Sequence, residues 1–442
     1  MMIPGRPTER ELDRQMSGAA SRRPARICMP TTRKFSRKVF ECGLYEAEDV
    51  LCDVDDVDLI GLEATPGFRV RERWVNRVIF RDVSHRAHRL NPGLRPKRLD
   101  RDYDLFVAFC PSYEELLYVN AIENWKDRCR VSACWIDEIW TASLEKYRHW
   151  LPMFKQFDHI LVTHQETASA LSAALGRPVT WLPAAVDTLR FTPYASSAPT
   201  SRSVDVYSIG RRREGIHDAL LRRARTTPFY YVYDTYRASV ADVYDVTAHR
   251  DLLANTAKRS RYFVVAPPKF DSQHETAGQV EVGYRYFEGA AAGCVLIGER
   301  ADSAAFRQLF PWDDAVIDLA TDGSDVAKVL SALAGEPERL SAMAHRNAAN
   351  SLLSHDWAYR WRALVELAGL PASDKMGARE ARLGECAAAA SGESPTPQLW
   401  STSTTLADVS RTAAMAATSH PSQDDNELRQ ETPRLRSASV SG

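Results

Sequence analysis

The fold is decided by the stretch Glu281-Val-Gly-Tyr-Arg-Tyr-Phe-Glu-Gly-Ala-Ala-Ala-Gly-Cys-Val-Leu-Ile297, which predicts a helix followed by an apolar strand. Gly283 opens this helix, and the small residues near its end allow it to lie close to a sheet. The free N–H groups and the positive dipole end at the start of a helix suit a diphosphate. The stretch therefore predicts an α/β fold with a phosphate site at the N-terminus of this helix.

Strands and helices alternate in the same way along most of the chain. Short apolar runs predict strands in the first half at Asp58–Leu62, Leu105–Phe109, Arg130–Trp135, His159–Val162 and Val179–Leu182. In the second half they predict strands at Val204–Ser208, Phe229–Tyr233, Tyr262–Ala266, Cys294–Ile297 and Ala315–Leu319. Helical spacing predicts helices at Tyr113–Asn124, Gln165–Leu175, Tyr284–Ala292 and Asp325–Ala334. This order favours two doubly wound, Rossmann-like domains that face each other across a cleft.

The chain has 442 residues, 44% of them apolar, and is long enough for two domains with flexible ends. We expect a disordered leader at 1–35, where prolines interrupt a basic sequence, and a disordered tail at 371–442, which is rich in Ala, Ser, Thr and Pro. An Ala-rich helix near Arg379–Ala390 is the alternative within this tail. Between them we expect an N-terminal domain at 36–193, a linker at 194–203 and a C-terminal domain at 204–370.

Charge and cysteine content disfavour several classes of protein. Lys and Arg total 57 and Asp and Glu 58, so the net charge of −1 provides no overall field for nucleic acid or anionic lipid, and local clusters must bind any anion. The eight cysteines lack the spacing of a zinc site, which favours reduced thiols. No apolar segment has the length of a membrane span or a signal peptide core. We expect a cytoplasmic protein, and the excess of Arg over Lys favours a bacterial source.

Arg285 and Glu288 are the first candidates for binding chemistry. They lie three residues apart on the predicted helix, so both side chains leave the same face. The cation suits a phosphate, and the carboxylate suits the paired hydroxyls of a ribose. The alternative is an intrahelical ion pair on a solvated face, which contributes only a few tenths of a kcal/mol.

The segment around this pair resembles the C-terminal signature of GT-B glycosyltransferases related to the spore maturation protein CgeB, in which an Arg-x-x-Glu pair precedes small residues, a glycine and an apolar strand. Phe157–Thr163 and Val179–Asp187 resemble the hinge region of such enzymes, and Ser208-Ile-Gly-Arg211 resembles the opening of their second domain. Later stretches resemble the final helices of the family, namely Ala301–Leu319, Pro337–Leu340, His355–Trp357 and Arg360.

The resemblance implies a donor site in the C-terminal domain. In related enzymes a glutamate on this helix holds the ribose of a nucleotide sugar, and a basic residue after the first strand of the domain meets the diphosphate. Glu288 and Arg211 occupy these positions here. A sugar contact is expected for Glu281, although it lies seven residues before Glu288 and the broader superfamily has a spacing of eight. The expected donor-binding residues are Arg211, Glu281, Gly283, Tyr284, Arg285 and Glu288.

Three residues on the acceptor side are catalytic candidates. Asp137 and Glu138 end a predicted strand between two tryptophans, where burial would raise a carboxyl pKa and suit the general base of an inverting enzyme. A helix N-cap is the alternative. His164 ends the next strand, where it would touch the sugar or acceptor, or cap the following helix. The resemblance favours a retaining enzyme, in which these residues position the substrate.

A metal site is one interpretation of Asp53-Val-Asp55-Asp56, which resembles the D-x-D box of the other glycosyltransferase fold. These carboxylates precede an apolar segment, a placement typical of turns and caps. We expect no metal and no cofactor, because GT-B enzymes usually stabilise the leaving diphosphate with protein cations.

The sequence therefore predicts a hexosyltransferase-like enzyme that moves a sugar from a nucleotide-diphosphate sugar to a glycan, protein, small molecule or, less favoured, DNA. One alternative is an epimerase or hydrolase of sugar nucleotides, and another is an inactive GT-B-like nucleotide-binding or interaction protein. A third is a DNA-base glycosyltransferase, in which the arginines between Arg211 and Arg225 contact phosphates. The nucleotide base, the sugar, the acceptor and the oligomeric state stay open at this point.

Overall fold

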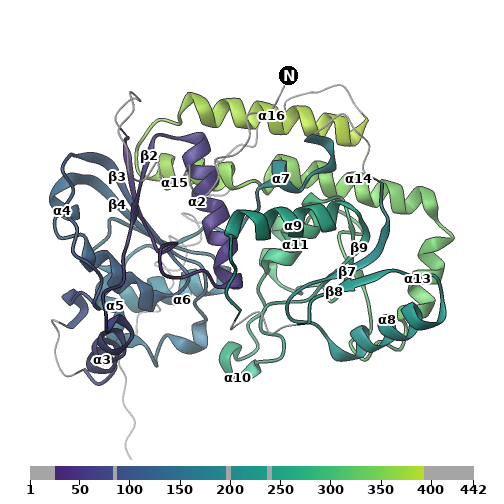
Figure 1. The fold of residues 1–442 in the computed structure, drawn as a ribbon, viewed down its shortest axis with the longest axis horizontal. Coiled ribbons are helices and arrows are strands. Elements are labelled where there is room, and N and C mark those ends of the chain that lie inside the picture. Colours follow the sequence, from purple (N-terminus) through teal and green to yellow (C-terminus); the bar gives the residue numbers. More distant parts are fainter. Residues whose placement is uncertain (1–24, 83–86, 196–200, 236–240, 393–442) are drawn as a thin grey trace, which may run out of the picture. The chain divides into compact units, whose positions relative to one another are not determined.

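The computed structural model describes residues 25–82, 87–195, 201–235 and 241–392. Two parallel sheets with helices packed around them form this part of the chain (Figure 1). The expected α/β class, with two parallel, doubly wound sheets, is confirmed. Within the described residues no helix is both long and apolar enough to span a bilayer.

The first sheet has the strand order β2-β1-β3-β4-β5-β6, and every pairing is parallel. Its strands are β1 Ile27–Thr31, β2 Val57–Gly61, β3 Tyr103–Cys110, β4 Cys129–Ile136, β5 His159–Val162 and β6 Thr180–Trp181. The α-helices of this half are α2 Cys42–Val54, α3 Phe68–Phe80, α4 Trp125–Arg128, α5 Leu151–Phe154, α6 Gln165–Leu175 and α7 Thr188–Phe191. The 3₁₀ helices are η1 Val39–Glu41, η2 Ala87–Arg89, η3 Tyr113–Ala121, η4 Thr141–Ser143, η5 Arg148–Trp150 and η6 Pro193–Ala195.

The second sheet has the order β11-β10-β9-β7-β8, again entirely parallel. Its strands are β7 Val204–Ser208, β8 Tyr231–Tyr233, β9 Ser260–Val265, β10 Val295–Gly298 and β11 Ile317–Asp318. Its helices are α8 Glu214–Thr226, α9 Val246–Lys258, α10 Gln273–Thr276, α11 Tyr284–Ala291, α12 Ala304–Leu309 and α13 Val326–Ala334. The strand order reverses between β7 and β9, and ligands of such sheets bind at the carboxyl ends of the strands on either side of such a reversal.

The N-terminal boundary needs a correction. The expected leader, 1–35, includes β1, which lies between β2 and β3 and is fully buried. Pro30 hides this strand in the sequence, because a proline inside an apolar run argues against a sheet interior. The part of the leader before residue 25, and residues 196–200 of the expected linker, lie outside the described residues.

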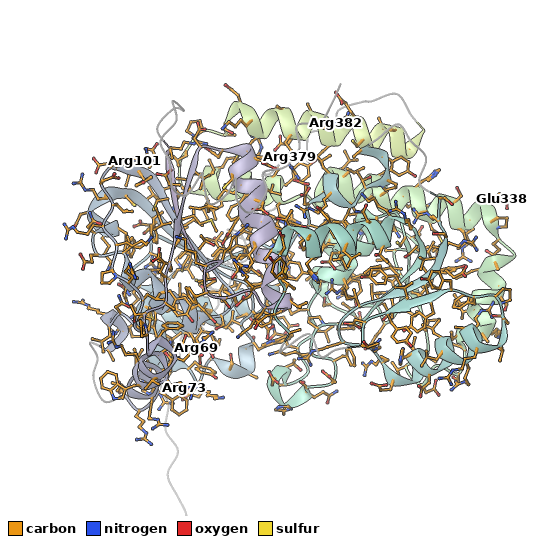
Figure 2. All side chains as sticks on the ribbon, viewed as in Figure 1. Arg69, Arg73, Arg101, Glu338, Arg379 and Arg382 are labelled. Atoms are coloured by element: carbon orange, nitrogen blue, oxygen red, sulfur yellow. The ribbon has the colours of Figure 1, made fainter. Side chains whose placement is uncertain are left out.

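The C-terminal boundary needs a correction as well. Part of the expected tail, 371–442, forms α16 Asp374–Ser391, which packs on α14 Pro337–Ser354. Its buried residues are Met376, Leu383, Cys386, Ala387 and Ala390, so only two large apolar side chains mark it in the sequence as a packed helix. Arg379 of α16 is 8% exposed and donates to Asp187 and Asp356, whereas Arg382 is 45% exposed (Figure 2). Residues beyond 392 lie outside the described part.

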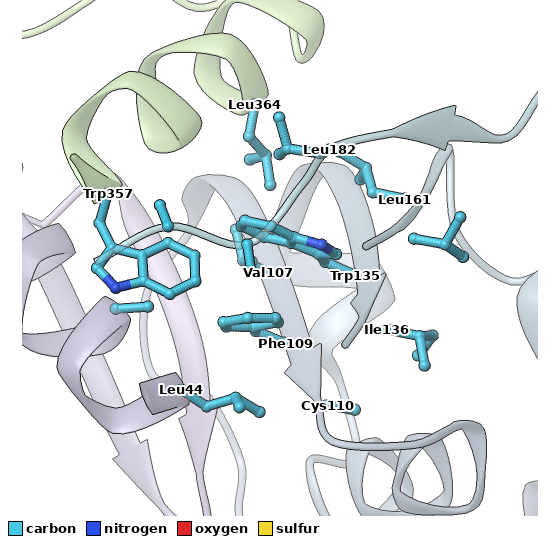
Figure 3. Packing of buried hydrophobic residues seen from close by; sticks show 14 of the residues in the cluster. Leu44, Val107, Phe109, Cys110, Trp135, Ile136, Leu161, Leu182, Trp357 and Leu364 are labelled. Carbon is cyan, nitrogen blue, oxygen red and sulfur yellow. The ribbon is translucent and has the colours of Figure 1, made fainter. Parts of the chain in front are cut away.

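Aromatic side chains join the first sheet to α15 Trp357–Leu367. Phe109 of β3 stacks on Trp135 of β4 with ring centroids 4.4 Å apart. Trp357 meets both rings edge-on, at 6.1 Å and 5.9 Å (Figure 3). The chain therefore returns after the second sheet to complete the core of the first.

Arg379→Ala should lower the free energy of unfolding by about 3 kcal/mol, because Asp187 and Asp356 are buried carboxylates that lose a neutralising cation. Arg382→Ala on the same helix should cost less than about 1 kcal/mol, because its ion pair with Glu385 is exposed. Urea unfolding followed by circular dichroism measures both values. Equal losses in the two variants would contradict the buried role of Arg379.

Candidate functional site

Cations gather at the reversal of strand order in the second sheet. Arg211 follows β7, is exposed, and pairs with Asp271 in the loop after β9. Its guanidinium also donates to the Ser272 hydroxyl at 3.3 Å. The next two arginines are less exposed and form ion pairs. Arg212 pairs with Asp234 at 3.2 Å, and Arg213 pairs with Glu299 at 2.5 Å. Arg211 is thus the most exposed of the three and bridges the two loops.

The N-terminus of α11 lies against the loop after β9. Gly283 is the N-cap residue, and no side chain caps the helix there. A Cβ atom at Gly283 would lie 3.4 Å from Pro268, in van der Waals contact with that loop. The start of α11, which no side chain caps, and the loops after β7 and β9 therefore belong to one region.

Glu288 is held from two sides. It is 1% exposed; Oε1 accepts a hydrogen bond from Arg250 at 2.5 Å, and Oε2 accepts one from Arg285. Burial raises the pKa of this carboxyl, but Arg285 and Arg250 together bring it below its ordinary value. Arg285 also borders Gly210, whose Cβ position would lie 3.7 Å from the guanidinium. The intrahelical pair predicted as an alternative is therefore present, and it is buried on the Glu288 side.

Arg250 links this cluster to the first sheet. Its guanidinium donates two hydrogen bonds to Glu46 of α2, at 2.8 Å and 3.0 Å. Glu46 also accepts from the backbone N–H of Asp187 at 2.8 Å. No local sequence pattern predicts the pairing of Arg250 with Glu46, because 204 positions separate the two residues.

Asp137 and Glu138 lie at the carboxyl end of β4, where residues of the second half reach them. The Tyr284 hydroxyl donates to Asp137 at 2.8 Å, and burial raises the pKa of Asp137 to about 7. Glu138 pairs with Lys269 in the loop after β9. Burial raises the pKa of Glu138, but the hydrogen bond from Lys269 brings it below its ordinary value. The two adjacent carboxyls are thus pushed in opposite directions, a feature typical of acid–base sites.

Glu281 and His164 lie in the same region but are turned into the protein. Glu281 is buried and accepts from Gln279 at 2.6 Å and from the backbone N–H of Gln165 at 3.3 Å, and burial raises its pKa to about 7. His164 Nδ1 lies 3.0 Å from the carbonyl oxygen of Ile139, and burial lowers the pKa of this imidazole to about 4. His164 is the N-cap residue of α6, but its side chain makes no cap hydrogen bond.

The structure therefore brings most of the predicted residues into two neighbouring groups. One contains Asp137, Glu138 and Tyr284, and the other contains Arg285 and Glu288. Lys269 was not among the predicted site residues. Its backbone is left-handed, with φ of 53°, which is unusual for a lysine and indicates a constrained loop. No sequence pattern reveals such a backbone conformation before the loop is seen.

The Asp53-Val-Asp55-Asp56 segment ends α2. Asp55 is the C-cap residue, and Arg26 donates to both of its carboxylate oxygens. Asp56 pairs with Lys375 at 2.6 Å. Within the described ranges no group of three or more His, Cys, Asp or Glu side chains is placed to hold a metal ion.

One family model matches a segment in the second half of the chain. Residues 212–366 match the model of the family described as glycosyl transferase-like. A comparison of the sequence with curated proteins gives no match.

Similar solved structures include an alpha-glucosyltransferase in complex with UDP and a 13-mer DNA containing a HMU base, at 9% identity and a TM-score of 0.46. Two further structures are an alpha-glucosyltransferase with UDP, at 10% identity, and one with UDP-glucose and DNA containing an abasic site, at 9%, both with TM-scores of 0.46. Each match covers 78% of this chain and 100% of the other.

The pKa of the Asp137 carboxyl should be about 7 in the folded protein, as measured by carbon NMR of labelled aspartate. Tyr284→Phe should raise it further, because the lost hydrogen bond favours the ionised form. The stability that Asp137 contributes is fully present below its unfolded pKa of about 4 and is lost as the pH rises through about 7.

Tyr286→Phe is the matched control, because the Tyr286 hydroxyl donates to the Glu299 carbonyl instead. It should leave the pKa of Asp137 unchanged. An ordinary aspartate pKa in the wild type, or equal shifts in both variants, would contradict the contact.

Proposed function

We propose that the protein is a hexosyltransferase that moves a sugar from a nucleotide-diphosphate sugar to an acceptor. The observation that carries this proposal is the contact of Tyr284 with Asp137. It brings the N-terminus of α11, where a diphosphate would bind, next to the carboxylates at the end of β4. The match of residues 212–366 to the glycosyl transferase-like family supports the donor side.

On the donor side, the diphosphate would bind between Arg211 and the first N–H groups of α11. Guanidinium groups meet phosphate oxygens through paired hydrogen bonds, and the helix dipole adds positive potential. Arg285 borders Gly210 in the loop that leads to Arg211, so it is placed to turn toward the phosphates. That turn would release Oε2 of Glu288 for a ribose hydroxyl, while Arg250 keeps Oε1.

On the acceptor side, Glu138 is the carboxylate that Lys269 keeps ionised, and Asp137 is the one that burial keeps partly protonated. Glu138 is therefore the better candidate to accept a proton or to orient an acceptor hydroxyl. We propose retention of configuration, with Asp137 and Glu138 as positioning groups. His164, with its lowered pKa, is a neutral hydrogen-bonding group at neutral pH.

A thermal-shift screen with UDP, GDP, ADP, TDP and their sugars tests the donor site. One nucleotide should raise the melting temperature of the wild type, because a ligand that binds only the folded state stabilises it. Arg211→Ala and Glu288→Gln should abolish that shift. Arg261→Ala is the control. This exposed arginine lies near the amino end of β9, whereas the proposed site lies at the carboxyl end, and it pairs with Asp205.

If no nucleotide shifts the melting temperature of the wild type, the donor site is not functional and an inactive interaction protein is the better interpretation. Arg211 is exposed, so its variant should fold normally even if the buried Glu288→Gln variant does not.

Hydrolysis or transfer of the identified donor should survive EDTA. The reason is that Arg211, Arg285 and Lys269 supply the positive charge that the departing diphosphate requires. Product release measured with and without EDTA, and with added Mg²⁺ or Mn²⁺, checks this expectation. Loss of turnover in EDTA that either metal restores would show that the transfer depends on a metal ion.

A further inference from the structure

The helix α3 presents an unusual outer face. Its inner residues, Phe68, Val75 and Ile79, are buried, and the helix packs on η2 and η5. Val70 and Trp74 point outward and are 72% and 57% exposed. Apolar side chains of this size are expected in a core or at an interface, and two on one helix face form a patch.

Arginines surround this patch. Residues 70, 74, 77 and 81 follow helical spacing, so Arg77 and Arg81 continue the line that Val70 and Trp74 begin, with Arg73 beside it. Figure 2 shows Arg69 and Arg73 on this helix. The exposed arginines of the segment are Arg69, Arg71, Arg73, Arg77 and Arg81.

These guanidinium groups are largely uncompensated. Arg69 pairs with Glu72 at 3.1 Å, but the other four arginines form no ion pair with any described residue. The patch continues past the end of α3, where Phe80 is 47% exposed and lies 6.4 Å from the Tyr147 ring. The Lys146 ammonium lies over that ring at 4.9 Å. Positive charge and aromatic surface therefore extend together onto the next segment.

We propose that the outer face of α3, from Val70 to Arg81, docks the protein on a bilayer surface that contains anionic phospholipid. Arginines bind lipid phosphates through paired hydrogen bonds, and each cation near such a surface adds to the attraction. Tryptophan prefers the level of the headgroups, and an exposed valine gains by burial there. A nucleic acid would use the arginines but would leave Val70 exposed to water, so the bilayer fits both kinds of side chain. This surface is separate from the proposed donor site.

The test is co-sedimentation of the full chain with vesicles of phosphatidylcholine alone and of phosphatidylcholine mixed with phosphatidylglycerol. The wild type should bind only the mixed vesicles, and added salt should weaken binding. Arg73→Glu combined with Arg77→Glu should reduce the partition coefficient about tenfold or more. Trp74→Ser should reduce it several-fold with no change of charge, and thermal melts should show that these exposed substitutions leave the fold intact.

The matched control combines Lys328→Glu with Arg346→Glu, two exposed cations of α13 and α14, and should bind like the wild type. An equal loss of vesicle binding in this control would show that binding depends on overall charge and not on the α3 surface, and would overturn the proposal. Absence of wild-type binding to the mixed vesicles would also overturn it. If duplex DNA competes with the vesicles and Trp74→Ser behaves like the wild type, the surface binds nucleic acid instead.

Discussion

The guanidinium of Arg250 lies between two buried carboxylates, Glu46 of α2 and Glu288 of α11. A single buried charge would cost several kcal/mol, so each member of this chain requires the others. Arg250 satisfies both carboxylates at once because its planar group offers donors in several directions. Removing one of the three groups would therefore leave buried charge with less compensation where the helices of the two sheets meet.

This constraint determines the position of α11. Glu288 anchors the second turn of the helix to α2 through Arg250, and Tyr284 anchors its first turn to Asp137 of the first sheet. Two attachments one turn apart leave the helix little freedom to rotate. A displacement of α11 toward a bound diphosphate would move Tyr284 and so change the environment of Asp137. The proposed donor and acceptor sides are thus joined through one short helix.

The sequence predicts the elements whose apolar pattern is local and misses contacts that form across the fold. The bounds of β5, β7 and α6 agree with expectation because uninterrupted apolar or helical periods define them. Pro30 conceals β1, because a proline is unusual inside a sheet. The alanines near Arg379–Ala390 indicate a helix there as an alternative, but α16 has too few large apolar side chains for the sequence to show that it packs on the fold. The roles expected for Arg211, Glu281, Gly283, Tyr284, Arg285 and Glu288, and for Asp137, Glu138 and His164, remain predictions.

The partners of these residues could not be predicted, for a physical reason. Arg250 and Lys269 belong to unremarkable stretches, and their importance comes from carboxylates that other helices and strands bring to them. Burial then decides what each charge does. Arg33, Arg250 and Arg379 lie between carboxylates inside the protein, whereas the exposed Arg71, Arg73, Arg77 and Arg81 form no ion pair with any described residue. The net charge of −1 sums the buried, neutralised arginines and the exposed ones. It therefore does not reveal the positive surface at α3, which becomes apparent only when the fold is known.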